Sequence, residues 1–518
     1  MATVRRALLS CADKTGLEEL ARALDALGVE LIASGGTARA LTDAKLRMVT
    51  VEEFTGVREQ LDGRVKTLHP KIHGGILARR DDPAHMEAVG AGGTIDLVCV
   101  NLYPFEDTVG RPGTTLADAV EQIDIGGVAL LRAAAKNFQH VAVLSRPEQY
   151  PRVIESLRAG GGALEEPFLR ELAVEAFELT SAYDRCIGDY LGAASAPASY
   201  AEEAFPERLT AEILRKQALR YGENPHQQGA WYVPAGGDGW GLATLTQLQG
   251  KELSYNNLID VEAAFRCLLE FQEPVSVIVK HTCPCGLAAG KTMDEAYVRA
   301  FECDPESAFG GIVGFNRPLD AAAARKLTET FLEVVLAPSV EPDAMELLAA
   351  KKNLRVVTLE WPAAIPAHPQ WREASGAWLL QEPDMPGREE PEPKVATARA
   401  PTDPERRDLA FAWKVAKHAK SNAIVVARDR ATVAIGQGQP SRVGSVRVAI
   451  ERAGSRAKGA VCASDAFFPF ADGVELLAGA GIRAVIQPGG SVRDQEVVAA
   501  ADAASVAMLL TGVRHFKH

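Results

Sequence analysis

Two adjacent residues, Lys280 and His281, carry the side chains best suited to catalysis. They end an apolar, β-type run at 275–279, and proline and glycine follow, which predicts a strand that ends in a turn. Ligands of α/β proteins bind at such strand ends. A histidine can carry a proton near neutral pH and a lysine can stabilise developing negative charge. The alternative is a strand end that faces solvent, or a histidine satisfied within the core.

A second set of candidate catalytic residues lies nearer the N-terminus. Lys66 belongs to a loop at 63–79 that holds four basic residues and two histidines, and Tyr103, Asp124 and Lys136 follow in other loops or at element ends. A condensation at an acyl group needs a lysine or tyrosine to polarise the carbonyl and an aspartate to receive the amide proton. The four residues therefore predict one acyl-condensing site, and the alternative for the loop is a solvated basic surface.

The elements that must position this second set alternate between strand and helix. Buried strands are expected at 4–10 and 29–34, with a helix of 3.6-residue periodicity at 17–27 between them. This order predicts a βαβ unit, and hence a parallel sheet with right-handed crossovers.

Two turns of this unit, at 10–16 and 34–39, place small and hydroxyl residues at helix N-termini. Backbone N–H groups and the helix dipole favour a phosphate there. The alternative is ordinary capping by Asp13, Thr15 and Thr37. Neither turn is GxGxxG, so a dinucleotide fingerprint is absent.

Composition sets the broad class. The chain has 518 residues, 47% hydrophobic and 24% charged, which is typical of a soluble protein of several domains. Its net charge of −12 disfavours nucleic-acid binding. The sequence contains no apolar run long enough to predict a membrane span. The first residues predict a strand and not a signal peptide. Eight cysteines without framework spacing suit a reducing cytoplasm.

Changes in composition predict the domain boundaries. An Ala-, Ser- and Pro-rich stretch at 192–206 separates expected domains at 1–195 and 205–518. Within the second domain, a Pro- and Glu-rich stretch at 362–404 predicts a seam between two α/β halves.

Two further features of the second domain suggest ligand contacts. Asn256, within KELSYNNLID, supplies an amide that can bind a carboxamide or a ribose. The aromatic run FFPF at 467–470 precedes Asp472, and it could form a shelf for a pterin-like ring. The alternative for the aromatic run is core packing.

Six motifs in the first 140 or so positions resemble a known enzyme domain; they are SxxDKTG, SGGT, GRVKTLHPKIHGG, NLYPF, DIGG and RAAAKN. The chain here is similar to the IMP cyclohydrolase domain of the bifunctional purine-biosynthesis enzymes. The resemblance implies a methylglyoxal-synthase-like α/β fold, and closure of 5-formamidoimidazole-4-carboxamide ribotide to IMP with loss of water.

The same resemblance implies residue roles. Lys66 would stabilise the oxyanion on the formyl group, and Asp124, Lys136 and Tyr103 would position the carboxamide and shuttle protons. The base pocket would be lined by Arg64, Thr67 and Asn101, and the 5′-phosphate would be held by Ser10, Lys14, Ser34, Gly36 and Thr37. Many family members carry serine where this chain has Ala12, so one phosphate hydrogen bond is expected to be missing or replaced.

The remaining motifs resemble the formyltransferase part of the same enzymes; they are RYGENPHQ, LSYNN, VKHTCPCG, DPESAFGG, KSN, GQGQPSR, SDAFFPF, QPGGSVRD and RHFKH. The resemblance implies two tandem cytidine-deaminase-like α/β domains and a homodimer whose formyltransferase sites use residues of both subunits. It also implies transfer of the formyl group of 10-formyltetrahydrofolate to the 5-amino group of AICAR, the aminoimidazolecarboxamide ribotide, without a catalytic metal.

The formyltransferase roles follow from this resemblance. His281 would act as base on the poorly nucleophilic amine, directly or through the carboxamide, and Lys280 would stabilise the oxyanion and protonate the departing folate nitrogen. Asn422 would hold the formyl oxygen. The pterin would contact Asp472, Phe467, Phe470 and Val443, and the ribotide would contact Arg220, Tyr221, Asn256, Arg514 and Phe516. Glu333 stands where the family often has aspartate and could bind the edge of the folate.

Two other hypotheses compete with this one. Cys283 and Cys285 could ligate zinc beside His281, but C-x-C differs from the deaminase signature, and the glutamate of H-x-E is missing. The chain could also be a nucleotide sensor without catalysis, but Lys66, Lys280 and His281 are all present.

Overall fold

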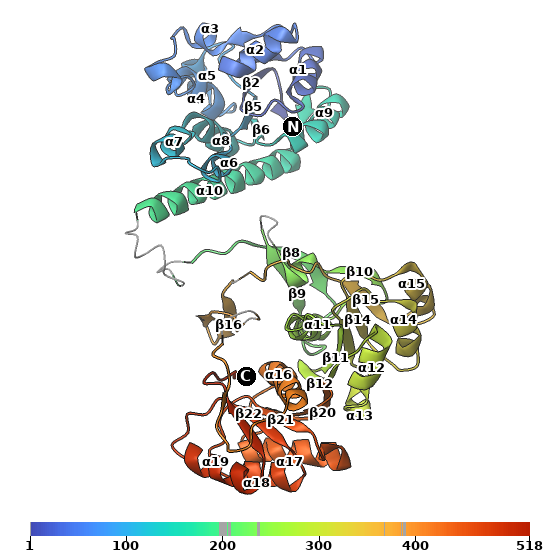
Figure 1. Cartoon of the computed structure of the whole chain (residues 1–518). Helices are drawn as coiled ribbons and strands as arrows, with labels where there is room; N and C mark the ends of the chain where they lie inside the picture. The colour runs from blue at the N-terminus through green and yellow to red at the C-terminus, as the bar shows by residue number, and fades with distance from the viewer. Residues whose placement is uncertain are drawn as a thin grey trace. The chain divides into compact units, whose positions relative to one another are not determined.

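The computed structural model describes residues 2–195, 205, 209–235, 239–366, 368–384, 386 and 390–518. It divides into two compact units, Met1–Glu203 and Ala204–His518 (Figure 1). Most of the linker predicted at 192–206, and some residues of the predicted seam, lie outside the described residues.

Unit 1 is built on a sheet of five parallel strands in the order β4-β3-β2-β5-β6. The strands are β2 Arg6–Cys11, β3 Glu30–Ala33, β4 Val49–Thr50, β5 Leu97–Asn101 and β6 Ala142–Leu144. β2 and β3 are parallel neighbours with helix α1 (Leu17–Ala26) between them in the chain, so the predicted βαβ unit is confirmed.

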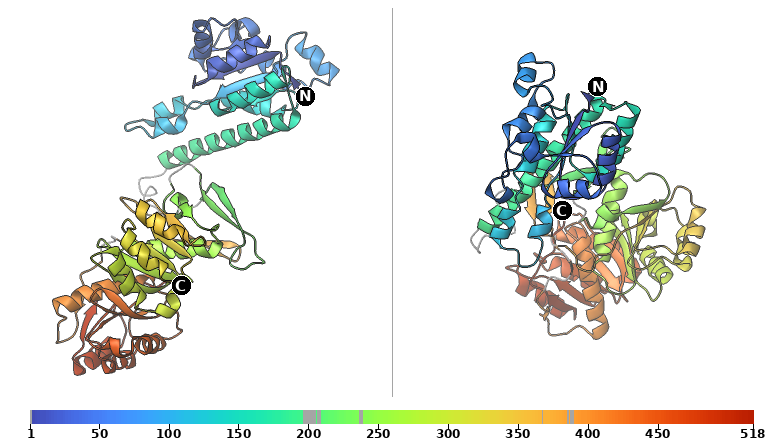
Figure 2. Two further views of the ribbon diagram at one scale, coloured as in Figure 1. Left: turned by 90° about the vertical axis from the view of Figure 1, so that its right-hand side faces the viewer. Right: turned by 90° about the horizontal axis from the view of Figure 1, so that it is seen from above.

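Helices cover both faces of this sheet. α1, α2 (Gly35–Asp43) and α9 (Tyr150–Ala159) lie on one face, and α8 (Gly126–Lys136) and α10 (Glu166–Ser195) lie on the other (Figure 2). The shorter elements are β1 Ala2–Thr3, α3 Val51–Thr55, α4 Pro70–Leu77, α5 Pro83–Val89, α6 Phe105–Val109, α7 Leu116–Glu121, β7 Ala163–Leu164 and 3₁₀ turns at Leu61–Gly63 and Pro147–Gln149. The near-continuous apolar strands are buried between the two helix layers, as expected for a parallel sheet.

Unit 2 contains a mixed sheet of twelve strands, in the order β10-β15-β14-β13-β11-β12-β20-β19-β21-β22-β23-β18. The first six are β10 Thr246–Gln249, β15 Arg355–Thr358, β14 Val334–Ala337, β13 Ile312–Phe315, β11 Val275–Lys280 and β12 Cys283–Ala289. The other six are β20 Ala431–Gly436, β19 Ile424–Arg428, β21 Val461–Ser464, β22 Ala484–Gln487, β23 Ala507–Leu510 and β18 Lys394–Val395.

The two halves of this sheet repeat one topology. Each has an antiparallel hairpin (β11–β12, β19–β20), three parallel strands (β13–β15, β21–β23) and an antiparallel edge strand (β10, β18). The helices repeat as well: α11 (Tyr255–Leu268) corresponds to α16 (Asp403–His418), and both pack on the same face. The other face carries α12 Met293–Phe301, α13 Pro305–Ala308, α14 Ala321–Thr328 and α15 Pro342–Ala349 in the first half, and α17 Arg442–Ala453, a 3₁₀ turn at Gly454–Ala457, α18 Asp472–Gly479 and α19 Asp494–Ala503 in the second.

The halves join through β12 and β20, which pair antiparallel at Ala288 and Ala431. Thr432, which is buried, strengthens this junction: its Oγ1 accepts from the Leu287 N–H at 2.9 Å and donates to the Leu287 carbonyl at 3.1 Å. A side chain thus replaces ladder hydrogen bonds where the two halves meet.

One sequence expectation needs correction. The turn after Lys280 is not a Pro/Gly-rich loop, because only His281 and Thr282 lie between β11 and β12. Pro284 falls within β12 at a shift in the pairing register, a position where a strand tolerates proline. The Pro- and Glu-rich stretch at 362–404, which the sequence indicates as a seam, contains the hairpin β16 (Gln370–Ala374) and β17 (Ala377–Gln381). A further hairpin, β8 (Ile213–Leu219) and β9 (Gly229–Pro234), and a 3₁₀ turn at Gly241–Thr244 complete unit 2.

Candidate active sites

In unit 1 the predicted phosphate residues gather at the carboxyl edge of the sheet. Ser10 lies near the end of β2 and Ser34 directly follows β3, and their hydroxyl oxygens are 3.4 Å apart. Ser34 occupies the N-cap position of α2 without a side-chain hydrogen bond to the helix. Both hydroxyls therefore face the N-terminus of α2, where N–H groups and the helix dipole favour an anion.

Two ammonium groups approach the same helix end. A β-carbon built on Gly35 would lie 3.7 Å from Lys66 Nζ, and one built on Gly36 would lie 3.9 Å from Lys14 Nζ. Lys14 Nζ also donates to the carbonyls of Cys11 and Ala12, and Lys66 Nζ lies 3.3 Å from a Glu59 carboxylate oxygen. The Gly-Gly pair of SGGT thus leaves room for two lysines from different loops.

Thr37 and Asn101 are buried and hold the β2–α1 loop in shape. Thr37 Oγ1 accepts from the Cys11 N–H at 3.0 Å and donates to the Cys11 carbonyl at 3.2 Å. Asn101 accepts from the Asp13 N–H at 2.8 Å and donates to the Asp13 carbonyl at 2.9 Å. Both side chains therefore serve the loop itself. The N-caps of α1 and α2 are Gly16 and Ser34, neither with a side-chain hydrogen bond, so helix capping by Asp13, Thr15 and Thr37 was the wrong alternative.

Asp124 lies just before α8, at the same end of that helix as Thr67. Its Oδ1 accepts from the Gly127 N–H at 2.7 Å, and a β-carbon on Gly126 would lie 2.9 Å from Thr67 Oγ1. Burial raises the pKa of Asp124, although N–H donors at the helix start oppose the shift. A carboxyl in this environment is a candidate proton carrier.

The other three predicted residues of unit 1 lie apart from this group or at its rim. Arg64 forms an ion pair with Glu121, and the Tyr103 side chain is exposed. Lys136 ends α8, about 15 Å of helix away from Gly126, since each residue adds about 1.5 Å. Helix α8 therefore separates Lys136 from Asp124, which lies just before its other end.

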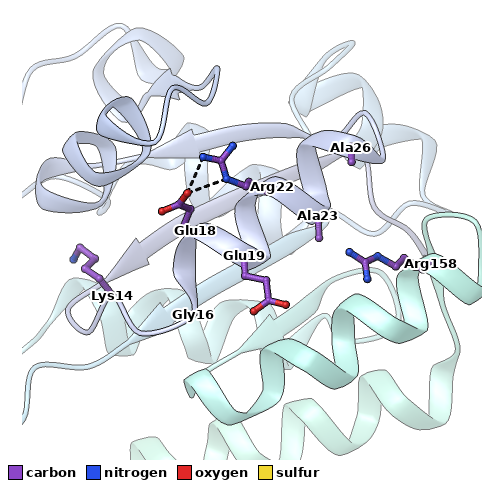
Figure 3. A pocket seen from close by; sticks show the side chains of 8 residues that line it. All are labelled: Lys14, Gly16, Glu18, Glu19, Arg22, Ala23, Ala26 and Arg158. Atoms are coloured by element: carbon purple, nitrogen blue, oxygen red, sulfur yellow. Dashed lines mark hydrogen bonds and ion pairs between the residues drawn. The ribbon is translucent and has the colours of Figure 1, made fainter.

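A surface groove of about 640 Å³ runs along α1 (Figure 3). It is lined by Lys14, Gly16, Glu18, Glu19, Arg22, Ala23, Ala26 and Arg158. The Glu18–Arg22 ion pair joins two neighbouring positions on α1, and Lys14 is the only lining residue of the groove that belongs to the predicted phosphate site. The mixed charges of its lining favour no one ligand.

In unit 2 the predicted formyltransferase residues share one edge of the sheet. Because β12 and β20 are antiparallel, as are β20 and β19, the amino end of β19 lies at the same edge as the carboxyl end of β11. Lys280 and His281 end β11, and Asn422 precedes β19. All the other predicted residues except Arg220 and Tyr221, which follow β8 of a separate hairpin, adjoin strand or helix ends at this edge: Glu333, Val443, Phe467, Phe470, Asp472, Arg514, Phe516 and, beside the start of α11, Asn256.

The Lys280–His281 pair is held by a carboxylate that the sequence reasoning missed. His281 and Thr282 have positive φ angles of 55° and 62°, and their N–H groups donate to Asp260 Oδ2 at 3.2 Å and Oδ1 at 2.5 Å. Burial raises the pKa of Asp260. Lys280 Nζ donates to the Phe309 carbonyl at 2.8 Å, while His281 is exposed. An aspartate one helical turn after LSYNN was the only available signal.

Glu333 already has protein partners. Asn257 Nδ2 donates to its Oε2 at 2.9 Å, and Arg355 lies 3.9 Å from the same oxygen. The neighbouring Asn256 instead donates to the Glu223 carbonyl at 3.1 Å, which ties α11 to the RYGENPHQ segment.

Within that segment, the guanidinium of Arg220 stacks 4.7 Å from the ring centre of Tyr221 and donates to its hydroxyl at 2.9 Å. The two residues predicted to bind the ribotide, Arg220 and Tyr221, thus contact each other directly.

The aromatic run divides between core and surface. Phe468 is fully buried, whereas Phe467 and Phe470 are exposed, and the Arg493 guanidinium lies 4.9 Å from the Phe470 ring centre. The core alternative therefore holds for Phe468 alone. Asp472 starts α18, and Asn422 Nδ2 donates to the Gln439 carbonyl at 2.8 Å.

The zinc hypothesis gains no support from the geometry of the described residues. Among the described residues, no three His, Cys, Asp or Glu side chains gather as a metal site. Burial raises the pKa of the Cys285 thiol to about 12 and also raises that of Cys283, which disfavours the thiolates that zinc prefers.

No helix within the described residues is long and apolar enough to span a bilayer.

Comparison with known proteins gives consistent matches. The family model for the AICARFT/IMPCHase bienzyme matches residues 134–452, and the model for the MGS-like domain matches residues 16–129, as the methylglyoxal-synthase-like prediction requires. The bifunctional purine biosynthesis protein PurH of Nostoc punctiforme is 51% identical, with 99% of this chain and 100% of the relative covered. PurH of a Cyanothece species is 52% identical, with 99% of each covered. One solved structure, the crystal structure of ForH, is 38% identical over 37% of this chain and 99% of its own, with a TM-score of 0.35.

Proposed function

The chain belongs to the AICARFT/IMPCHase bienzyme family, and from this premise we propose which of its residues carry out each of the two reactions. It is a bifunctional enzyme of purine biosynthesis, with AICAR formyltransferase and IMP cyclohydrolase activities. The full-length similarity to PurH proteins is the observation that carries this conclusion.

We assign the cyclisation to unit 1. The ribotide phosphate would bind at the N-terminus of α2, held by Ser10, Lys14, Ser34, Gly36 and Thr37. Lys66 would then stabilise the oxyanion that forms when the carboxamide nitrogen attacks the formyl carbon, and Asp124, with its raised pKa, would carry the amide proton. Tyr103 and Lys136 remain candidates for proton transfer, and Arg64, Thr67 and Asn101 for the base pocket.

We assign the formyl transfer to the edge of unit 2 that holds Lys280 and His281. His281 would take a proton from the amine as it attacks the formyl carbon, and Lys280 would stabilise the tetrahedral oxyanion and protonate the departing folate nitrogen. Asn422 would hold the formyl oxygen. The ribotide would contact Arg220, Tyr221, Asn256, Arg514 and Phe516, and the folate would contact Glu333, Val443, Phe467, Phe470 and Asp472.

We further propose 10-formyltetrahydrofolate as the formyl donor, since the resemblance implies it and the exposed Phe467 and Phe470 offer a surface for a ring. A homodimer with shared formyltransferase sites, cytidine-deaminase-like halves and a cytoplasmic location belong to the same proposal. The repeated topology of unit 2 supports the two-half architecture.

A paired assay tests the assignment of sites. Lys66→Met and Lys280→Met each remove one charge while keeping most of the side-chain volume. Each reaction is measured alone, with formylated ribotide for cyclisation and AICAR plus 10-formyltetrahydrofolate for transfer. We expect Lys66→Met to lower only cyclisation and Lys280→Met to lower only transfer, each about 100-fold or more. Lys71→Met, a change to the lysine five residues after Lys66, is the control and should leave both rates unchanged. Equal loss of both reactions in either variant would refute the division of labour.

A further inference from the structure

The C-terminal tail of unit 2 has two different faces. Along residues 514–518 the exposed positions alternate with buried or half-buried ones. Arg514, Phe516 and His518 form the exposed row: the Arg514 guanidinium is 4.6 Å from the Phe516 ring centre, which is 5.6 Å from that of His518. His515 and Lys517 point the other way. The face with Arg514 and Phe516 is the one that we assign to the ribotide.

His515 is buried between two carboxylates from the segment that joins the two halves. Its Nδ1 lies 2.6 Å from Asp384 Oδ2. Its Nε2 lies 3.1 Å from Glu390 Oε1 as an ion pair without a hydrogen bond. The ring also lies 5.1 Å from that of Trp413 on α16, whose Nε1 donates to Glu390 at 3.1 Å. Two carboxylates and one imidazole thus hold three separate segments together.

The backbone and Lys517 complete the attachment. The His515 N–H donates to the Asp465 carbonyl at 3.0 Å, and the Ser421 N–H donates to the Lys517 carbonyl at 2.9 Å. Lys517 Nζ donates to the His418 carbonyl at 3.0 Å. Ser421 directly precedes Asn422, so the tail is bonded to the chain beside a proposed formyltransferase residue.

We propose that His515 is a positioning residue for formyl transfer: held as a cation by Asp384 and Glu390, it fixes the C-terminal tail so that Arg514 and Phe516 meet the ribotide. This inference rests on the proposed roles of those two residues. Removing the cation would leave two carboxylates facing a neutral ring and release the tail from the seam segment. A displacement of about 1 Å in substrate-binding groups can cost up to about 100-fold in rate.

The charge of His515 follows from its surroundings. Burial alone would lower its pKa, but Asp384 and Glu390 outweigh this and raise the pKa of His515 to about 9. Lys417 pairs with Asp384 at 3.2 Å and with Glu270 at 3.2 Å, so it moderates the negative charge. The other charged side chains lining the adjoining cavity of about 350 Å³ are Glu392, Arg406 and Lys414.

The test measures both reactions of the full-length enzyme in three variants. We expect His515→Gln to raise the KM for AICAR about tenfold or more while cyclisation of the formylated ribotide in unit 1 stays unchanged. His515→Lys, which keeps a cation, should recover much of this loss. Glu392 lies in the same segment as Asp384 and Glu390, but its carboxylate shows no ion pair with His515 among the described contacts. Glu392→Gln is therefore the control, and its KM for AICAR should match that of wild type.

A pH profile adds a readout that a merely structural role would not move. In wild type, the KM for AICAR should rise as the pH passes about 9, because His515 then loses its proton, and this limb should be absent in His515→Gln. If His515→Gln does not fold, Asp384→Asn serves in its place, with the same expected rise in KM. A wild-type KM in His515→Gln, or an equal loss in Glu392→Gln, would overturn the inference.

Two more variants separate this inference from the proposed function. If Arg514→Ala and Phe516→Ala raise the KM for AICAR but His515→Gln does not, the positioning role alone fails. If those two variants leave the KM unchanged, the proposed ribotide contacts fail, and with them the premise.

Discussion

The two halves of unit 2 contain the same hairpin with different chemistry. In the first half, His281 and Thr282 turn β11 into β12 with φ angles of 55° and 62°. In the second, Asp429 and Arg430 turn β19 into β20 with φ angles of 52° and 56°. Each turn donates both N–H groups to one aspartate, the half-buried Asp260 on α11 or the buried Asp408 on α16. Each aspartate lies five residues after the first residue of its helix.

The aspartate beneath each turn belongs to the architecture, whereas the lysine and histidine belong to one turn only. An aspartate that accepts from both turn amides is needed in each half to support a tight turn with positive φ, and so it is not in itself a catalytic feature. Only the first half places a lysine and a histidine there. The two turns lie at opposite edges of the sheet, because the hairpins are related by the antiparallel pairing of β12 and β20. The fold therefore contains the same scaffold twice, and only one of its two turns carries the side chains that we propose for catalysis.

The largest expected effect comes from exchanging the tip residues. Asparagine tolerates positive φ, so His281→Asn and Asp429→Asn alter chemistry with little backbone strain. His281→Asn should lower formyl transfer by about 100-fold to 10,000-fold, the usual contribution of a general base. Asp429→Asn should leave it unchanged. Steady-state rates of transfer and of cyclisation check this, and a comparable loss in both variants would show that the turns differ less than their sequences suggest.

The second prediction concerns the place where the halves meet. Ten residues after each capping aspartate lie Glu270 and His418, and these two equivalent positions contact each other, with His418 Nε2 3.0 Å from Glu270 Oε1. Lys417 is 3.2 Å from the same oxygen. Glu270→Gln leaves the buried Lys417 underpaired and should cost about 3 kcal/mol of unfolding free energy at pH 7. Urea denaturation of the intact enzyme measures it.

The pH dependence of this loss has a definite sign. Burial would raise the pKa of Glu270, but His418 and Lys417 outweigh it and lower the pKa below its ordinary value of 4.5. The stabilisation is therefore complete above pH 4.5 and disappears as the pH falls below it. Wild type and Glu270→Gln should converge in stability under acid, and a constant difference down to pH 3 would contradict the pairing.

The smallest expected changes come from removing the aspartate that supports each turn. Asp260→Asn and Asp408→Asn each leave one turn N–H without an acceptor and should lower stability by similar amounts, about 1–3 kcal/mol. Only Asp260→Asn should also lower formyl transfer, by about tenfold, because it loosens the turn that carries His281. Thermal unfolding and kcat together check both parts. Equal kinetic effects would mean that Asp260 acts only through global stability.

Local patterns predicted much of this molecule. The apolar run before Lys280 indicated a strand, and β11 ends at Lys280. The alternation near the N-terminus indicated a βαβ unit with loops that suit phosphate. Such patterns report burial and periodicity over a few residues, which is why they located strand ends with reactive side chains.

Other features depend on contacts between distant segments. Pro284 within β12, Asp260 beneath the turn and Glu270 against His418 were beyond prediction, because each depends on strand order and helix packing over as many as 148 residues of separation. The same holds for His515, whose carboxylate partners come from a segment that the sequence showed only as Pro- and Glu-rich.

Residue type and periodicity are local properties, so the amino-acid sequence alone indicates which reactive groups lie at which strand ends. Folding of the whole unit is what brings the groups of β11, β19 and the C-terminal tail to one edge of a twelve-stranded sheet. The reason is physical: strand order and pairing direction minimise exposed apolar surface and unpaired backbone groups over the whole unit, and no short stretch of sequence contains that balance.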